Sequence, residues 1–202
     1  MANRKTSEIE LIRQELSEMD TLFRKIIKII PSFDITDPKV LPYGLKPHTR
    51  SVSWIVEQVI TQQAKYNRKK LNIQDIDIDL PDTCLHDCVV KKAGKTYFVN
   101  IKITNAEGRR NKNDIAAVEK LYMQYNVKPD YRLIYAVFGF KFRNINISFV
   151  KDYVHLFSPQ FLPIYVNPRN DKIQAYYKAE PEERSRVDFL RLLRENSRSI
   201  AL

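Results

Sequence analysis

Cysteine is scarce in this sequence, which limits what its thiols can build. The 202 residues include only Cys84 and Cys88, too few for a disulfide framework. With His86 between them the two thiols suggest a metal site at first sight, but a C-x3-C pair without a second pair lacks four ligands. We therefore expect two free thiols, buried or half-buried, in a reducing cytoplasm.

Long apolar runs are missing as well, and so is a leader pattern. No uncharged run approaches the ~18 apolar residues of a membrane span. The first residues, Met1-Ala2-Asn3-Arg4, show no signal-peptide pattern. These absences favour a chain that folds in the cytoplasm and not in a membrane.

Positive charge, by contrast, is abundant. Lys and Arg total 34 against 24 Asp and Glu, which gives a formal net charge of +10 and a pI near 9.5. An excess of this size favours a polyanionic partner, and nucleic acid is preferred over a membrane surface. A hydrophobic share of 44% at this length fits one globular domain with a sizeable core.

The stretch from His86 to Asn105 predicts a β-hairpin with a polar site at its edge. Two β-prone runs flank the turn residues Ala93-Gly94. Asn100 and Lys102 are two residues apart, so they share one face of the second strand. The residues that point to the opposite face are apolar: Val99, Ile101 and Ile103. Asp87 begins the neighbouring strand, from which its carboxylate can reach the polar face.

These residue types suit phosphodiester cleavage. Mg²⁺ binds hard oxygen ligands and keeps several waters, so one or two carboxylates with substrate phosphate suffice. The ion polarises the scissile phosphate and lowers the pKa of an attacking water. A lysine ammonium stabilises charge that develops on the phosphate or orients that water. The alternative is an ordinary amphipathic hairpin whose Asn100 and Lys102 are simply solvated.

The pattern resembles the PD-(D/E)xK nuclease superfamily, whose type II restriction endonucleases carry an acid, a hairpin turn and then acid-x-Lys. Asp87 corresponds to the first acid, and Asn100-Ile101-Lys102 stands where acid-x-Lys is expected, with a neutral amide in place of the second acid. The segments NIKITN after the hairpin and EPEERSRVDFL near the C-terminus also resemble small type II restriction endonucleases, including SwaI-like enzymes. This resemblance covers residues 45–195.

The resemblance implies a fold and an activity. It implies a mixed α+β fold, with a central mixed sheet flanked by helices, and one nuclease domain over residues 1–202. The implied enzyme is a homodimeric, Mg²⁺-dependent type II restriction endonuclease of the prokaryotic cytoplasm, which cuts double-stranded DNA at a short site and has a cognate DNA methyltransferase. Two alternatives stay open: a structure-specific or repair nuclease of the same superfamily, and a catalytically inactive DNA-binding protein that kept the fold.

A helix precedes the expected hairpin, and the resemblance gives one of its residues a role. The run from Val52 to Tyr66 has helical periodicity, since apolar residues recur along it: Trp54, Ile55, Val56, Val59 and Ile60. In nucleases of the superfamily the helix before the hairpin often contributes an acid to the metal site. The resemblance therefore implies that Glu57 supplies the charge that Asn100 lacks, with Asp87, Asn100 and Glu57 as metal ligands and Lys102 as a catalytic residue. The alternative is a glutamate on a solvated helix face.

The N-terminal segment, residues 1–31, predicts another helix. Ser7 with Glu10 forms a capping box, and Pro31 ends the helical pattern. Its apolar stripe has spacings of three and four: Ile9, Ile12, Leu16, Met19, Phe23, Ile26 and Ile30. The stripe either packs on its own domain or forms the seam of a dimer.

The remaining segments complete a mixed α/β order of elements. Asp114 is a good N-cap for a helix, and segments 131–138 and 145–150 predict strands separated by a turn at 139–144. Segment 167–177 is polar and aromatic with little sign of a core, and a last helix is expected after it. Basic, amide and aromatic side chains suited to phosphate or base contacts are the candidate DNA-binding residues: Arg50, Arg109, Arg110, Lys112, Asn113, Arg169, Lys172, Gln174 and Tyr176.

Overall fold

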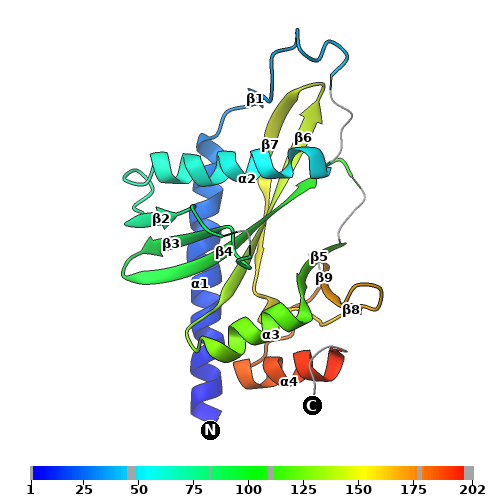
Figure 1. The fold of residues 1–202 in the computed structure, drawn as a ribbon. Helices are drawn as coiled ribbons and strands as arrows, with labels where there is room; N and C mark the ends of the chain where they lie inside the picture. The colour runs from blue at the N-terminus through cyan, green and yellow to red at the C-terminus, as the bar shows by residue number, and fades with distance from the viewer. Residues whose placement is uncertain (1, 45–48, 82, 109–111, 177–178, 198–202) are drawn as a thin grey trace.

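A six-stranded mixed sheet forms the centre of the fold (Figure 1). The computed structural model describes residues 2–44, 49–81, 83–108, 112–176 and 179–197. The strand order is β1-β7-β6-β4-β3-β2, and within this sheet the β4–β6 pair is parallel whereas the other pairs are antiparallel. The strands are β1 (Phe33–Asp34), β2 (Asp75–Asp77), β3 (Cys88–Lys92), β4 (Lys95–Asn105), β6 (Leu133–Arg143) and β7 (Asn146–Phe157). The expected mixed α+β fold is confirmed.

Helices and a smaller sheet cover the central sheet. The first two helices are α1 (Ala2–Ile29) and α2 (Thr49–Tyr66), and their apolar sides bury one face of the sheet in the main core. The other face packs against α3 (Val118–Val127), α4 (Arg186–Asn196) and the three-stranded sheet β5-β9-β8. That sheet contains β5 (Lys112–Ala117), β8 (Val166–Asn167) and β9 (Lys172–Tyr176). A short 3-10 helix, η1 (Pro159–Phe161), lies between β7 and β8 along the chain. In the described part of the chain, no helix is both long and apolar enough to cross a membrane.

Strand β6 lies between the two cores because both of its faces are apolar. Ile134, Ala136 and Phe138 belong to the main core. The alternate residues Leu133, Tyr135 and Val137 belong to the second core. A strand buried on both faces has a continuous apolar sequence, as this one has. β6 therefore fixes its parallel neighbour β4 at the centre of the molecule.

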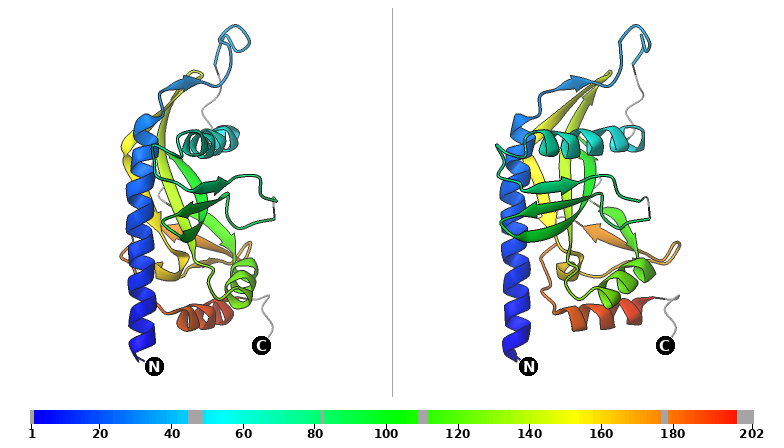
Figure 2. Two further views of the ribbon diagram at one scale, coloured as in Figure 1. Left: turned by 90° about the vertical axis from the view of Figure 1, so that its left-hand side faces the viewer. Right: turned by 60° about the vertical axis from the view of Figure 1, so that its left-hand side comes forward.

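Helix α1 runs along the side of the sheet (Figure 2), and its apolar stripe is buried within its own chain. Met19, Phe23 and Ile26 are almost fully buried in the main core. The helix begins at Ala2, before Ser7, so the expected start at a Ser7 capping box is wrong. It ends at Ile29, as the proline at position 31 predicts.

Ion pairs from α1 fix the sheet at two points. The buried Glu15 carboxylate takes two hydrogen bonds from Arg132, just before β6, at 2.8 Å to Nε and 2.7 Å to Nη2. Glu18 accepts from Lys95 Nζ at 2.8 Å and from the Tyr97 hydroxyl, both at the start of β4. Paired, charge-assisted contacts of this kind fix orientation as well as contributing energy. Helix α1 therefore holds the beginning of β4, the strand that carries Asn100 and Lys102.

The β6–β7 hairpin is longer than the sequence predicted. The turn expected at 139–144 is too wide, because β6 continues to Arg143, β7 begins at Asn146 and the chain reverses at Asn144, whose φ is 60°. Gly139 lies inside β6 at a register shift between Phe138 and Phe140. A Cβ atom at Gly139 would lie 2.5 Å from Cγ of Tyr153 on β7. This glycine therefore makes room for a neighbouring ring and does not form a turn.

The segment before α3 was also predicted wrongly. Asp114 is not an N-cap: it lies in β5, and α3 begins at Val118 with Ala117 as a cap that makes no side-chain hydrogen bond. The Asp114 carboxylate instead accepts hydrogen bonds from Asn170 Nδ2 at 2.7 Å and Gln174 Nε2 at 2.8 Å. These partners come from the β8–β9 hairpin, which the order of residues along the chain does not reveal. Tertiary pairing therefore took precedence over the local capping signal.

The C-terminal segment contains core residues that the sequence hid. Ile173 and Ala175 of β9 are fully buried in the second core, whereas Lys172 and Tyr176 are exposed. This is the period-two alternation of a half-buried strand. The expectation that the segment has little sign of a core is therefore wrong.

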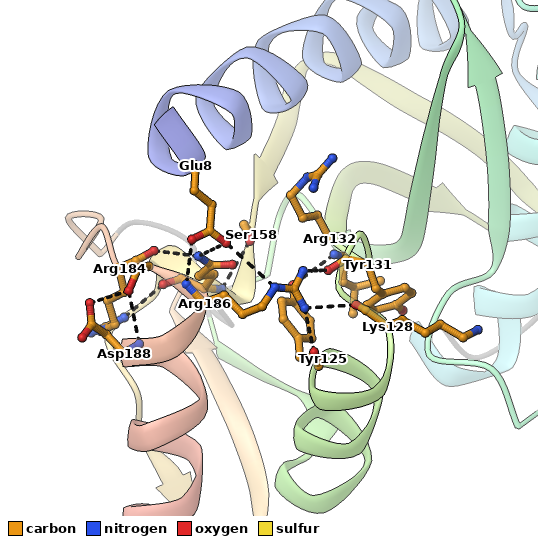
Figure 3. A network of polar contacts seen from close by, with 12 residues as sticks. Glu8, Tyr125, Lys128, Tyr131, Arg132, Ser158, Arg184, Arg186 and Asp188 are labelled. Carbon is orange, nitrogen blue, oxygen red and sulfur yellow. Dashed lines mark hydrogen bonds and ion pairs between the residues drawn. The ribbon is translucent and has the colours of Figure 1, made fainter. Parts of the chain in front are cut away.

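The motif EPEERSRVDFL has a structural role, because its residues Arg184, Arg186 and Asp188 belong to a network of polar contacts (Figure 3). Ser185 caps α4, because its Oγ accepts from Asp188 N at 3.3 Å and lies 2.6 Å from Asp188 Oδ2. The Arg186 guanidinium donates to the carbonyl oxygens of Tyr125 at 2.7 Å and Lys128 at 3.1 Å, and its backbone N–H donates to Glu8 Oε2 at 3.0 Å. Arg186 thus connects α4 to the end of α3 and to α1, beside the second core.

Gly139 provides a test of this packing. Gly139→Ala should destabilise the protein by about 1–3 kcal/mol, because its methyl group meets the fixed base of the Tyr153 ring and strains the hairpin. The free energy of unfolding in urea measures this cost. Tyr153→Gly removes the ring and also the Cβ atom, which would lie 2.6 Å from the added methyl group. In that background the same Gly139→Ala change should cost far less, and an equal cost in both backgrounds would contradict the steric explanation.

Candidate functional site

The candidate site forms where β3 separates from β4. The two strands pair from Lys92↔Lys95 to Cys88↔Val99, and then Asp87 N donates to Val99 O at 2.8 Å. The next backbone N–H of β4, at Ile101, donates to Asp87 Oδ2 at 2.6 Å. A side-chain carboxylate thus replaces the backbone acceptor that a longer β3 would have supplied. This leaves Asp87 fixed in orientation beside an open strand edge.

Strand β4 presents two kinds of face at this edge. Val99, Ile101 and Ile103 are buried in the main core. Asn100 and Lys102 point to the opposite face, as the alternation predicted. Asn100 is only 7% exposed, and its Nδ2 donates to Leu85 O at 2.9 Å. Among the described residues its Oδ1 atom has no hydrogen-bond partner.

An unpartnered buried oxygen of this kind calls for an explanation. A buried polar atom without a partner costs about 1–3 kcal/mol, so native proteins keep few of them. A cation or an ordered water would satisfy Asn100 Oδ1. This atom lies one strand position across from Asp87, whose neighbour Cys88 pairs with Val99. The unpartnered oxygen and the fixed carboxylate therefore belong to one small region.

Glu57 of α2 shares the electrostatic field of this region. Burial raises the pKa of Glu57 to about 7, and the charge of Asp87 raises it as well, while Lys102 opposes the rise. Burial also raises the pKa of Asp87, which Lys102 and the hydrogen bond from Ile101 oppose. Charges influence one another in this way only at short range. The structure therefore brings together Glu57, Asp87 and Lys102, from three separate segments of the chain.

The donor set fits a hard cation. Among the described residues no group of three His, Cys, Asp or Glu side chains could hold a metal ion, so a site built on those residue types alone is absent there. Two carboxylates, Asp87 and Glu57, and the unpartnered Asn100 oxygen are nevertheless the oxygen ligands that Mg²⁺ prefers, with waters and phosphate completing the shell. Burial raises the pKa of both carboxyl groups, and the charge of Asp87 adds to the rise at Glu57, so a bound cation would favour the ionised form of both.

The nearby thiols and histidine have other surroundings. Cys88 is fully buried, which raises the pKa of its thiol, and Cys84 is partly buried. His86 Nδ1 lies 3.2 Å from the Tyr131 hydroxyl and packs edge-on against Phe98. These side chains support the loop before Asp87.

The predicted DNA-binding residues lie mostly on the smaller sheet and its turn. Arg169, Lys172 and Tyr176 are exposed, and Gln174 is half-buried and bonded to Asp114. For the other five predicted DNA-binding residues the structure does not describe the side chain. Arg109 and Arg110 lie outside the described residues, and only the backbone is described for Arg50 in α2 and for Lys112 and Asn113 in β5.

The sequence did not reveal two features of the molecule. The first is the Asp114 network with Asn170 and Gln174, for which the only signal was an acid that also suits a helix cap. The second is Trp54, whose place in the apolar pattern of α2 suggested burial but which is 70% exposed. A helical wheel centred on the buried residues Val56 and Ile60 would have placed Trp54 on the outer side.

The raised pKa of Glu57 predicts how the stability of the protein depends on pH. Its folded-state pKa of about 7 exceeds the ordinary 4.5, so the folded protein binds the extra proton and loses stability as pH rises through that window. Glu57→Gln cannot ionise and should therefore stabilise the metal-free protein at pH 8, by about 1–2 kcal/mol after allowance for solvent screening. At pH 4.5 the variant and the parent should unfold alike, which urea titrations in EDTA would measure.

Glu18→Gln is the matched control for this effect. Hydrogen bonds from Lys95 and then Tyr97 lower the pKa of Glu18, so its stabilisation is present above the ordinary pKa and is lost as pH falls. The Glu18 change should therefore destabilise the protein at pH 8. A Glu57→Gln variant that is also less stable than the parent at pH 8 would show that the Glu57 carboxylate is not repelled in its site.

The comparisons with known proteins agree with this architecture. No family model matches the chain, and no curated protein matches it. Among solved structures, the NlaIV restriction endonuclease is similar over 91% of this chain and 78% of its own, with a TM-score of 0.56 and 17% sequence identity. At this identity the likeness concerns the fold. The chain therefore has a fold similar to that of a restriction endonuclease.

Proposed function

We propose that this protein is a type II restriction endonuclease, which hydrolyses both strands of double-stranded DNA at a short specific site with Mg²⁺ as its cofactor. One observation carries the proposal: Glu57, Asp87 and Lys102 share an electrostatic site at an open strand edge, beside the unpartnered oxygen of Asn100. The similarity to the NlaIV restriction endonuclease and the net charge of +10 support it. The assignment to the PD-(D/E)xK superfamily and to its SwaI-like members rests on the sequence motifs.

The residues of the site divide the chemistry between them. Asp87, Glu57 and Asn100 would hold Mg²⁺, which when bound supplies charge stabilisation to the scissile phosphate and acidifies the attacking water. Asp87 is the anchor, because the Ile101 N–H fixes its carboxylate. Lys102 places its ammonium beside the phosphate and stabilises the negative charge that develops on it, and it also orients the water. Glu57 gives the site the second negative charge that Asn100 lacks.

Exposed cations and amides would bind the DNA around this centre. Arg169 and Lys172 are exposed and suited to phosphate contacts, while Gln174 and Tyr176 are suited to base edges or to stacking. The proposal assigns the same role to the residues whose side chains are not described: Arg50, Arg109, Arg110, Lys112 and Asn113. Phosphate contacts would set the register of the duplex, and base contacts would select the sequence.

A homodimer suits this function, since a two-fold axis lets each subunit read one half of a palindromic site. The apolar stripe of α1 is buried within its own chain, so the dimer would form through another surface. A cognate DNA methyltransferase in the same prokaryotic cytoplasm would protect the host DNA from cleavage.

A second candidate rests on Asn100. A neutral residue at the position of an expected acid favours a protein that kept the fold and binds DNA without cutting it. A plasmid-nicking assay with Mg²⁺ and with EDTA separates the enzyme from the binder. Sharp, discrete products indicate a restriction enzyme, whereas cleavage that follows DNA structure or damage indicates a repair nuclease.

Lys102 provides the direct test of the mechanism. Lys102→Ala should reduce nicking by at least a hundredfold while DNA affinity, measured by anisotropy, changes little, because the ammonium acts on charge that develops in the transition state. Lys151→Ala removes an exposed lysine of β7 and serves as the matched control, which should nick normally. Near-normal nicking by the Lys102 variant would remove this hairpin from the active site.

Asn100 provides a test of the metal site. Asn100→Asp adds a charge with little change of shape, so it should lower the Mg²⁺ concentration needed for half-maximal nicking. The rise in melting temperature on adding Mg²⁺ should saturate at a lower concentration too, which is a readout independent of cleavage. Glu57→Gln should move both midpoints upward, and the double variant should be non-additive if both residues contact one ion. An unmoved midpoint in both measurements would place Asn100 outside the metal shell.

A further inference from the structure

We propose that Trp54 is a substrate-contacting residue of this site, which stacks its indole on a nucleobase of the bound DNA beside the scissile phosphate. The inference rests on the proposed function and adds a residue that neither the motif nor the fold assigns. In this proposal the bound DNA strand passes across the outer side of α2. The contact would position the strand, because a stacked base cannot slide relative to the helix.

Helix geometry places Trp54 next to the acid of the site. Residues three apart in an α-helix are surface neighbours with Cβ atoms about 5–6 Å apart, so Trp54 lies one turn before Glu57 on the same side of α2. Glu57 is half-buried on α2, and this helix contacts β4, the strand that carries Lys102. A strand whose phosphate reaches Lys102 therefore passes within reach of the indole.

Among the residues that the structure describes, none covers Trp54. The inner side of α2 is complete without it, since Val52, Val56, Ile60 and Ala64 are buried at 2% exposure or less. Trp54 is 70% exposed, and it is the single tryptophan of the chain. Tryptophan is among the side chains least often left in water, and an indole offers every base the same flat surface for stacking.

Charge decides which occupant fits this surface. The chain carries a net charge of +10, which attracts a polyanion such as DNA. Tyr66, at the far end of the same helix, is also exposed, at 86%. It lies twelve residues from Trp54, which is about 18 Å along the helix, and on a different side. Tyr66 therefore provides a matched control that should not touch the same strand.

Because Trp54 is the sole tryptophan, its own fluorescence reports the contact. The Lys102→Ala protein, which should bind without cutting, is titrated with linear plasmid DNA while anisotropy of a labelled DNA fragment measures binding separately. We expect the indole emission to fall as the DNA binds and its quenching by acrylamide to weaken. DNA binding with unchanged emission and unchanged quenching would overturn the proposal and leave the proposed function intact. An absence of both DNA binding and nicking in the parent protein would instead end the proposed function, and this inference with it.

Substitutions separate stacking from other roles. Trp54→Ala should weaken DNA binding about tenfold, whereas Trp54→Phe keeps a flat ring and should recover most of the affinity. Tyr66→Ala should stay within about twofold of the parent. The melting temperature should hardly change in any of the three, since these side chains are exposed. Equal affinity of Trp54→Ala and the parent would overturn the proposal, and so would loss of the dimer in gel filtration, which would assign the indole to a second copy of the chain.

Discussion

The hydrogen bond from the Ile101 N–H to the Asp87 carboxylate is the contact on which the candidate site depends. It ends the pairing of β3 with β4 and at the same time satisfies the strand edge that this ending exposes. A backbone group that needs an acceptor thus fixes a carboxylate in one orientation, without a dedicated side chain. The rest of the site follows from that point, because Asn100 and Lys102 lie on either side of Ile101 on the opposite face of the strand.

The site combines this fixed acid with an electrostatic cost. Two partly buried carboxyl groups with raised pKa values, Glu57 and Asp87, share one lysine, and the amide oxygen of Asn100 stays without a partner. Such an arrangement persists only where the surrounding structure holds it in place. Here the holding elements are the Glu18 contacts at the start of β4, the Glu15–Arg132 pair before β6, and a β6 strand that is buried on both faces. Charged and polar groups are paired in the scaffold, whereas the site keeps an unpartnered oxygen and two carboxyl groups of raised pKa.

The sequence predicted the parts of this arrangement that depend on local periodicity. The alternation along β4 identified the face of Asn100 and Lys102, and the helical spacing of residues 52–66 placed Glu57 on a helix. Both succeed because side-chain direction in a strand or helix follows from residue number alone. The nearness of Glu57 to Asp87 came from the resemblance, since residues thirty apart have no fixed relation until the chain folds.

The failures have the opposite character, because each depends on a partner distant in sequence. Asp114 has the side chain of a helix cap, but two amide donors of the β8–β9 hairpin bind it and turn its segment into a strand. Gly139 has the appearance of a turn residue, but the ring of Tyr153 occupies the space that any Cβ atom would need. Ile173 and Ala175 give too short an apolar pattern to reveal a core strand, and only pairing with β5 buries them. Trp54 differs from these three, because a helical wheel drawn through the buried residues of α2 already places it on the outer side. A large apolar side chain in that place fits the contact with bound DNA that we propose.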